Sequence, residues 1–429
     1  MSIILRARDF KLTAVVMMLF LVTNGCGKGK SGTKPSAEIE AKLAAIRQVG
    51  EPVTPAELNQ WYVEPPAAEN AAPLYAQAFA ALVSEDADSP SFVEKNQKAL
   101  QLLHQAATRT QCRFPTDFKA GQKASMPHLA RIKTCAKLLA QEATLNARKG
   151  KMDLAAQSVI DGLRLGWSLE AEPSVISQLI RIAVEQIATA GLEQALNHKG
   201  FSEIELAKLM SAFEDAERGG TGMFARAFVG ERCLTAHMFV APSPDVAESL
   251  ALIGQSFSPS FFDNYRKSST NQVDYAFCLD QFKNIIEAAK LPFPECLESA
   301  SQWTARMSDA KSKGYVISGV MLPPLSKALE RSAARLAEMR AGQVAIAVER
   351  SRLAHGVVLP IGLSSLVPQY LNAVPTDPFD GKPLRYKKKS PKAYVVYSIG
   401  PDRQDDNGTL AKANSPPGTK FDLVFMVDR

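Results

Sequence analysis

Residues 138–170 read LLAQEATLNARKGKMDLAAQSVIDGLRLGWSLE, and this stretch decides the fold class. Small and apolar residues recur at intervals of three or four on both sides of the short segment Lys149-Gly150-Lys151. That spacing places them on one face of a helix, and glycine permits a tight turn between two helices. The stretch therefore predicts an antiparallel helical hairpin, in which small residues let the two helices approach closely.

The hairpin resembles a tetratricopeptide-type unit, in which a pair of antiparallel helices stacks on the next pair. The sequence has no convincing second copy at the same period, and stacked repeats normally need about three copies to bury a core. We therefore expect a body of packed helical hairpins. A regular array of such repeats would go beyond this expectation.

The same helical periodicity continues through the body of the chain, from residue 37 to residue 355. The predicted helix at 174–197 is apolar on more than one face, which is typical of a central core helix. Arg181 and Glu185 interrupt its apolar run and argue against insertion into a membrane. The predicted helices cover residues 69–84, 91–111, 125–149, 152–170, 174–197, 202–217, 272–290, 295–312 and 326–355.

Residues 241–273 have a weaker pattern and contain several prolines. They predict a loop-rich linker with one short helix near 246–256, a place for a mobile lid or a subdomain boundary. The chain has no HExxH or GxSxG motif, and no two of its five histidines lie three or four residues apart. A hydrolase site assembled from distant residues near this linker is the alternative function that the sequence leaves open.

The N-terminus has the layout of an export signal over residues 1–25. Three basic residues precede an uncharged stretch at 12–23, whose helical length of about 18 Å is short of the roughly 30 Å that spans a bilayer. Small residues and then Cys26 follow, and this ending resembles a bacterial lipoprotein signal with Thr23 where Leu is usual. The resemblance implies lipidation of Cys26; ordinary cleavage and an uncleaved anchor are the alternatives. Residues 26–36 then form a flexible tether.

Five cysteines remain besides Cys26: Cys112, Cys135, Cys233, Cys278 and Cys296. Their number is odd and none forms a CxxC pair, so neither a zinc cluster nor a redox dithiol is predicted. One or two disulfides would suit an oxidising compartment. Burial as a free thiol is the expectation for at least one of them.

After His355 the composition changes to short apolar stretches separated by turns. We predict a short helix at 363–371, which ends the region of residues 326–371 that leads into the tail. Strands are then expected at 384–388, 393–399 and 421–427, in a small antiparallel sheet within residues 372–429.

Two motifs flank the first two strands: Val-Pro-Thr-Asp-Pro-Phe-Asp-Gly at 374–381 and Tyr-Ser-Ile-Gly-Pro-Asp at 397–402. From about residue 345 to residue 408, the order of helix, motif, strands and second motif resembles the C-terminal half of type II secretion pseudopilins. The N-terminal helix of that family is missing here, so the resemblance implies a helix-plus-sheet module on an unrelated helical body. The whole layout also resembles exported bacterial proteins that have no assigned activity.

Asp402, Asp405 and Asp406 place three carboxylates within five residues, between Gly400 and Gly408. Carboxylates this close repel one another unless a cation or solvent screens them, and calcium accepts such oxygen ligands in a flexible loop. The pseudopilin resemblance implies calcium as well, and Asp402 matches that pattern best. The alternative is an ordinary solvated turn, and no other cofactor is predicted.

Six basic residues without an intervening acid occupy the first predicted hairpin: Lys382, Arg385, Lys387, Lys388, Lys389 and Lys392. They fit either contact with anionic envelope polymers or lipid headgroups, or solvated charges that protect an exposed sheet edge, which is the simpler interpretation.

The composition supports a globular exported protein. Hydrophobic residues make up 46% and charged residues 22% of the chain, which excludes wholesale disorder. A net charge of +6, spread over most of the chain, gives no basis for nucleic-acid binding. We expect a mainly α-helical body at 37–325 and a small C-terminal sheet. The expected function is a non-catalytic, lipid-anchored scaffold with an envelope protein partner, in the periplasm or on the cell exterior.

Overall fold

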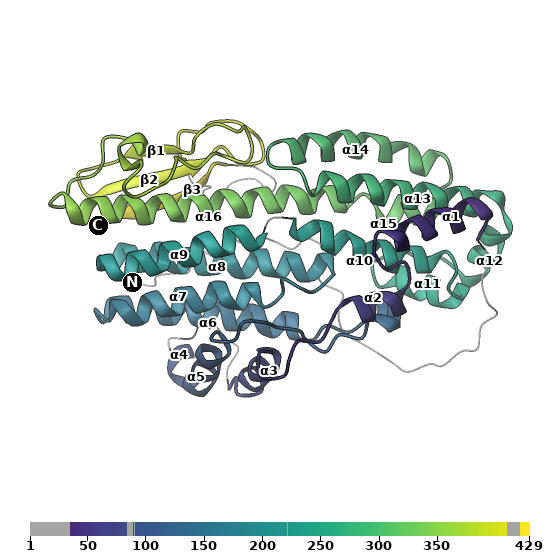
Figure 1. Ribbon diagram of the computed structural model, residues 1–429, viewed down its shortest axis with the longest axis horizontal. Helices are drawn as coiled ribbons and strands as arrows, with labels where there is room; N and C mark the ends of the chain where they lie inside the picture. Colours follow the sequence, from purple (N-terminus) through teal and green to yellow (C-terminus); the bar gives the residue numbers. More distant parts are fainter. Residues whose placement is uncertain (1–34, 84–88, 90, 221, 410–420) are drawn as a thin grey trace.

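The computed structural model describes residues 35–83, 89, 91–220, 222–409 and 421–429. Over these residues the protein is mostly helical with a small antiparallel sheet near the C-terminus, which confirms the predicted fold class (Figure 1). The predicted signal peptide, Cys26 and most of the tether lie outside the described residues. The α-helices are α1 (Ala37–Gln48), α2 (Pro55–Trp61), α3 (Ala72–Ala80), α4 (Phe92–Lys95), α5 (Gln97–Ala106), α6 (His128–Arg148), α7 (Met152–Trp167), α8 (Val175–His198), α9 (Glu203–Gly220), α10 (Met223–Met238), α11 (Ser243–Ala251), α12 (Pro259–Lys267), α13 (Ser269–Ala288), α14 (Glu295–Ser312), α15 (Val316–Met321) and α16 (Leu325–Ala354). Short 3-10 helices are η1 (Phe118–Lys123) and η2 (Leu363–Leu366), and the strands are β1 (Arg385–Lys388), β2 (Ala393–Ser398) and β3 (Leu423–Asp428).

Helices α6 and α7 form the predicted hairpin, and α8 packs against both. The turn between them contains Gly150, whose φ of 74° favours glycine. At the crossings with α8, a Cβ on Gly162 would lie 3.1 Å from the Cβ of Ala188, and a Cβ on Gly191 would lie 3.3 Å from the Cβ of Ala140. Small residues therefore set the close approach of α6 and α7 to α8, whereas the sequence predicts such an approach between the two helices of the hairpin.

Helix α8 is the central helix of this layer. Of the described residues, only α8 combines the length and the composition that could cross a membrane, and most of it is buried inside the protein. This burial agrees with the predicted role of a core helix.

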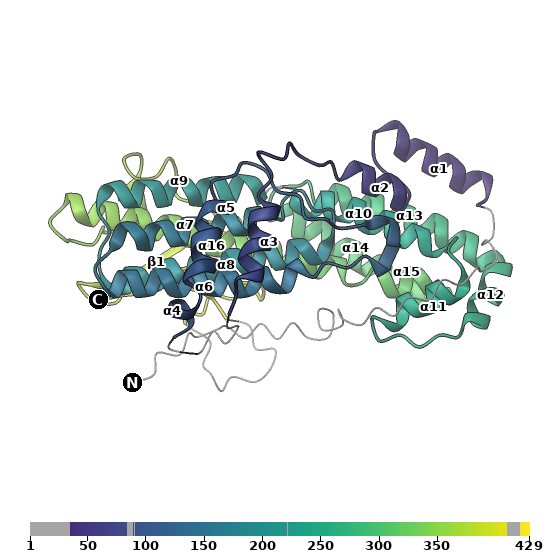
Figure 2. The ribbon, with the colours of Figure 1, turned by 90° about the horizontal axis from the view of Figure 1, so that it is seen from below.

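Helix α16 is the longest helix and runs along the molecule (Figure 1). Its 30 residues span about 45 Å at about 1.5 Å per residue. The first part packs in a hydrophobic core with α10, α13 and α14, and the second part in a core with α7, α8, α9 and the sheet. In both ribbon views, α1, α11, α12 and α15 gather at one end (Figures 1 and 2). We call this the α12 end, and the opposite end, with the C-terminus of α16 and the strands, the sheet end.

Residues 241–273 are not a loop-rich linker, because α11, α12 and the start of α13 occupy them. Pro244 and Pro259 lie in the first turns of α11 and α12, where proline is tolerated, and the short helices give too few turns for a clear period. Helix α10 was not predicted either. It is buried on several faces, so its sequence lacks the one-sided apolar stripe that marks an amphipathic helix.

The sheet has the order β1-β2-β3 with antiparallel neighbours. The three strands lie within two residues of the predicted bounds. Tyr394 and Val396 of β2 and Phe425 of β3 share a hydrophobic core with α8, α9 and α16, so the core continues across residue 372.

The outer edge of β3 is covered by α8. Glu193 accepts the Met426 N–H at 2.8 Å, and the Asn197 side chain accepts the Asp428 N–H at 2.6 Å. The β1 strand is the other edge, and its Lys387 and Lys388 are exposed. Lysines on this edge agree with the predicted protection of an exposed sheet edge.

The five described cysteines are buried free thiols: Cys112, Cys135, Cys233, Cys278 and Cys296. Burial raises the pKa of the Cys296 thiol to about 12 and that of Cys135 to about 12. Such thiols stay protonated at neutral pH and are poor nucleophiles.

Candidate functional site

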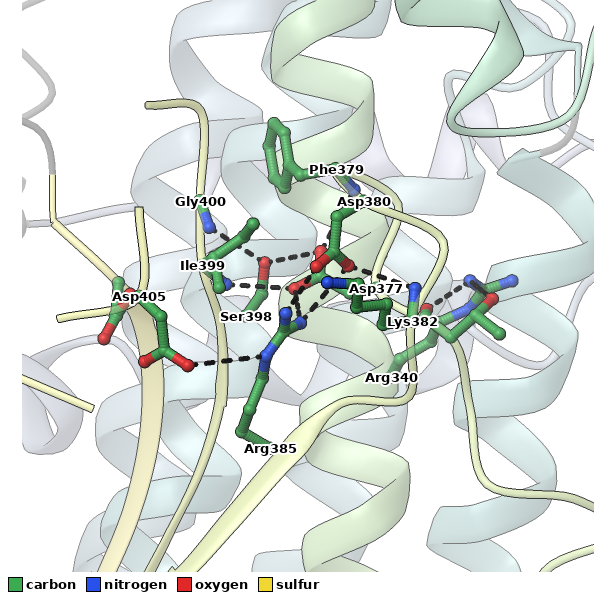
Figure 3. A network of polar contacts seen from close by, with 12 residues as sticks. Arg340, Asp377, Phe379, Asp380, Lys382, Arg385, Ser398, Ile399, Gly400 and Asp405 are labelled. Atoms are coloured by element: carbon green, nitrogen blue, oxygen red, sulfur yellow. Dashed lines mark hydrogen bonds and ion pairs between the residues drawn. The ribbon is translucent and has the colours of Figure 1, made fainter. Parts of the chain in front are cut away.

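The most connected polar cluster lies where the two C-terminal motifs meet, around the buried carboxylate of Asp377 (Figure 3). Its Oδ1 accepts the Phe379 N–H at 3.0 Å and the Ser398 hydroxyl at 2.9 Å. Its Oδ2 accepts the Ile399 N–H at 3.0 Å and the Arg385 guanidinium at 2.6 Å. Two donors on each oxygen fill the acceptor capacity of a carboxylate.

This cluster gives the two motifs a shared structural role. Asp377 belongs to the first motif, Ser398 and Ile399 belong to the second, and Arg385 lies on the strand between them. The first motif turns at Gly381, which has a φ of 70° and donates its N–H to the Asp377 carbonyl at 2.8 Å. Because every lone pair of the carboxylate is engaged, the cluster locks the tail rather than supplying a base or a nucleophile.

Arg385 connects this lock to the surface. Its guanidinium lies 2.5 Å from Asp380 and 3.9 Å from Asp405. Although burial acts to raise the pKa of Asp380, the hydrogen bond from Arg385 lowers it below its usual value. Arg340 of α16 donates to the Thr376 carbonyl at 2.6 Å and so fixes the first motif to the long helix (Figure 3).

The predicted calcium residues lie in the loop after β2, and the carboxylates of Asp402 and Asp405 accept local N–H groups. Asp402 accepts the Gln404 N–H at 3.2 Å, and Asp405 accepts the Asn407 N–H at 2.9 Å. Among the described residues, no group of three or more His, Cys, Asp and Glu side chains is placed to hold a metal ion. Calcium takes six to eight oxygens, and calcium binding by Asp402, Asp405 and Asp406 stays a prediction.

Sequence reasoning missed Asp422, which organises the same loop from the other side. Its two oxygens accept the N–H groups of Asp406 at 3.3 Å and Gly408 at 2.7 Å. Burial raises the pKa of Asp422, and the nearby charges of Asp405 and Asp406 raise it as well. Its position at the start of the third predicted strand is the one sequence signal, since a carboxylate there can cap a loop.

His104 on α5 lies between carboxylates from α6 and α7. Its Nδ1 is 2.5 Å from Asp161, and its Nε2 is 3.0 Å from Glu142. Although burial acts to lower the pKa of His104, the hydrogen bonds to these two carboxylates raise it to about 10. The Ser158 hydroxyl donates to the same Glu142 oxygen at 2.8 Å. An imidazolium held on both nitrogens cannot accept a proton from a serine, so this cluster links α5 to the hairpin.

Arg181 and Glu185, which interrupt the apolar run of α8, are fully buried and meet Arg335 of α16. Glu185 accepts from Arg181 Nε at 2.9 Å, and its other oxygen contacts Arg335. Although burial acts to raise the pKa of Glu185, the charges of Arg335 and Arg181 lower it below its usual value. Breaking such a buried group is costly, so it ties α8 to α16.

The 241–273 segment gives no support to an assembled hydrolase site. Ser243 is buried, donates its hydroxyl to Asp263 at 2.6 Å and accepts from Arg266 at 3.0 Å. Because Ser243 is buried and held between a carboxylate and a guanidinium, its hydroxyl is not exposed to a substrate. These contacts join α11 to α12.

A pocket of about 260 Å³ lies between α9, α16 and residues 368–375. It is smaller than the roughly 300–1,000 Å³ that small-molecule sites usually offer. Its Arg350 is held by Glu203, with Nε at 2.8 Å from the carboxylate. The side chains that line it include Met210, Glu214, Gln343, Arg350 and Tyr370.

The chain matches no protein-family model, no curated protein and no solved structure, so its function has to be inferred from these contacts.

Proposed function

We propose that the protein is a non-catalytic scaffold of the bacterial cell envelope, held at a membrane by lipid on Cys26. One observation carries the scaffold part of this proposal. The carboxylates of Asp377 and Glu185 and both ring nitrogens of His104 are engaged by partners within the protein. Each cluster joins separate elements of the fold, so its chemistry serves rigidity, which suits a protein that presents fixed surfaces to a partner.

The anchor part of the proposal rests on the sequence from the basic N-terminal residues to Cys26. The first described helix, α1, begins only eleven residues beyond that cysteine, at Ala37. A tether of this length reaches at most about 36 Å when fully extended. The folded body would therefore stay close to the membrane that holds the lipid.

Fatty-acid labelling of the full chain in a bacterial host tests the anchor. We expect Cys26→Ser to abolish labelling and to release the protein from the membrane fraction, because the acyl chains attach through this thiol. Thr23→Leu is the matched control, since it restores the residue that is usual at that position and should keep the label. Unchanged labelling of Cys26→Ser would refute the anchor.

A further inference from the structure

The loop after α16 exposes an unusual set of apolar side chains at the sheet end. Gly356 has a φ of 65°, and the Val357 N–H donates to the Arg352 carbonyl at 2.8 Å, which ends the helix in a Schellman motif. In that motif the residue at the position of Val357 usually packs its apolar side chain back onto the helix. Here Val357 is 61% exposed and has a φ of 73°, which is strained for a β-branched residue.

Val357 has apolar neighbours that are exposed in the same way. Leu353 is 52% exposed, Val358 65% and Ile361 94%. We call these four side chains the apolar tip. Residues 353–376 contain no Asp, Glu, Lys or Arg, so the tip carries no charge of its own. An exposed apolar cluster of this kind marks a surface that contacts another apolar phase.

Basic turns from two helical connections lie at the same end. Lys149 and Lys151 are exposed in the turn between α6 and α7, and Lys199 is exposed after α8. Arg148 donates to the His198 ring at 3.2 Å, and a Cβ on Gly150 would lie 3.5 Å from the Lys199 Nζ. The two turns are therefore in contact, although about 50 residues separate them in the sequence.

The β1–β2 hairpin adds a third basic turn, and a series of contacts connects it to the other two. Asn197, next to His198, binds the Asp428 N–H of β3, and Asp428 pairs with Ala393 beside the hairpin turn. Lys388 of that hairpin donates to the Leu359 carbonyl, within the loop of the apolar tip, at 3.0 Å. The exposed lysines of this hairpin are Lys387, Lys388, Lys389 and Lys392.

The sheet end has fewer exposed acidic residues than exposed lysines. Glu203 is occupied by Arg350, at 2.5 Å from its guanidinium. Glu205 caps its own helix by accepting the Ser202 N–H at 2.6 Å. Asp153 and Asp428 are the other exposed acids in these turns and strands. The seven exposed lysines of the three turns therefore place an excess of positive charge at the same end of the molecule as the uncharged tip.

We propose that the sheet end binds the surface of an anionic lipid bilayer, with the apolar tip inserted between headgroups and the lysines on anionic phosphates. An anionic polymer would use the lysines but leave the tip exposed, whereas a bilayer satisfies both features. The described chain starts at the opposite end, where the Ser36 N–H donates to Gln272 of α13 at 2.9 Å. The tether joins the folded body at the α12 end and, at about 36 Å, is shorter than the roughly 45 Å of α16. The proposed contact of the sheet end with a bilayer is therefore separate from any anchor on Cys26.

Amide hydrogen exchange on the full chain with phosphatidylcholine vesicles, with and without phosphatidylglycerol, tests this binding. Every arm carries Cys26→Ser, so the result does not depend on lipidation and can fail separately from the proposed anchor. We expect amides of residues 353–361 to exchange at least about tenfold more slowly with anionic vesicles only, because insertion excludes water from the loop. High salt should reverse the effect.

Two variants separate the contribution of the apolar tip from that of the lysines. The triple change Val357→Ser, Val358→Ser and Ile361→Ser should abolish the protection of residues 353–361. The change of Lys149, Lys151 and Lys199 to Gln, far from the loop in sequence, should weaken vesicle binding by about fivefold per lysine.

The matched control is the change of Leu252, Ile253 and Phe261 to Ser at the α12 end, which should leave the protection unchanged. Equal protection with uncharged vesicles, no protection with anionic vesicles, or the same protection with soluble polyglutamate would each overturn the proposal.

Discussion

The two ends of the molecule expose similar apolar side chains in different electrostatic settings. At the α12 end, Leu252, Ile253 and Phe261 are 39%, 44% and 38% exposed, on a stretch without Asp, Glu, Lys or Arg from residue 249 to residue 262. At the sheet end, the apolar tip is more exposed and shares its end of the molecule with exposed lysines from three turns. Exposure alone does not distinguish these surfaces, but the surrounding charge does, because long-range attraction to an anionic surface needs the lysines.

The polar cores behind these surfaces differ as well. At the sheet end, Asp377 has two donors on each oxygen. At the α12 end, buried Asp274 accepts on one oxygen only, from the Tyr265 hydroxyl at 2.5 Å and the Ile317 N–H at 3.1 Å. Among the described residues its Oδ1 has no hydrogen-bond partner. The sheet end is therefore fixed by a saturated carboxylate and the α12 end by a partly satisfied one, and we expect the first to be the more rigid.

The largest effect should come from Asp377→Ala, which removes the centre of the sheet-end lock. The change leaves the Ser398 hydroxyl, two backbone N–H groups and part of Arg385 without their acceptor, so we expect a loss of about 3 kcal/mol or more of unfolding free energy. Urea denaturation would measure this loss, and hydrogen exchange should show opening of β2. The control is Asp380→Ala, a partly exposed partner of Arg385, which should cost about 1 kcal/mol or less. Equal costs would show that Asp377 is not the centre of the lock.

Tyr265→Phe should have a smaller effect, at the α12 end. It removes one of the two donors of Asp274, and an under-satisfied buried acceptor costs about 1–3 kcal/mol. Hydrogen exchange in α12 and α15 would locate the change, and urea denaturation would give its size. Tyr386→Phe is the matched control at the sheet end, because among the described residues its buried hydroxyl has no hydrogen-bond partner. A similar cost for both variants would mean that the Tyr265 hydroxyl contributes nothing specific.

The helices and strands also show what the sequence can predict. The α6–α7 hairpin and the three strands follow from local periodicity and turn residues, and the structure has them within a few residues of the expected bounds. The short helix expected near 246–256 corresponds to α11, but α10 and α12 were missed because a helix buried on several faces, or one only two turns long, leaves no clear period.

The polar clusters were harder to predict because their members lie far apart in sequence. The Asp377 cluster was indicated only as two motifs, and their contact through Ser398 is a tertiary event. His104 and Asp161 are separated by 57 residues, with no local signal for their pairing. The calcium prediction rests on carboxylates counted along the chain, and the contacts of Asp402 and Asp405 with neighbouring N–H groups and with Arg385 could not be read from that count.

The pH dependence of stability should also differ between the two halves of the molecule, and Glu231 represents the half that includes the α12 end. Glu231 of α10 is partly buried and accepts the Val175 N–H at 3.2 Å, and burial raises its pKa to about 7. The folded state then binds more protons than the unfolded state between about pH 4.5 and 7, so stability should fall as pH rises through that window. Glu231→Gln keeps the acceptor without the charge and should stabilise the protein by about 1–2 kcal/mol at pH 8. Exposed Glu287→Gln is the control, and thermal melts at pH 5 and pH 8 would compare them. A variant equally stabilising at both pH values would contradict the assignment.

The smallest effect should come from His104, which packs in the other half of the molecule and titrates in a different window. Its folded pKa of about 10 lies above its usual value of 6.5, because Asp161 and Glu142 hold the charged ring. The stability that it contributes is therefore complete below about pH 6.5 and is lost as pH rises towards 10. Because the side chain is one-third exposed, solvent screening should keep the contribution below about 1 kcal/mol. His104→Gln should flatten the stability curve between pH 7 and 10, measured by urea denaturation, and should leave the Glu231 window below pH 7 intact. The exposed His355→Gln variant should follow the parent curve throughout. If His104→Gln instead changed the curve only below pH 7, the ring would be neutral in the folded protein, and α5 would be held to the hairpin by packing rather than by charge.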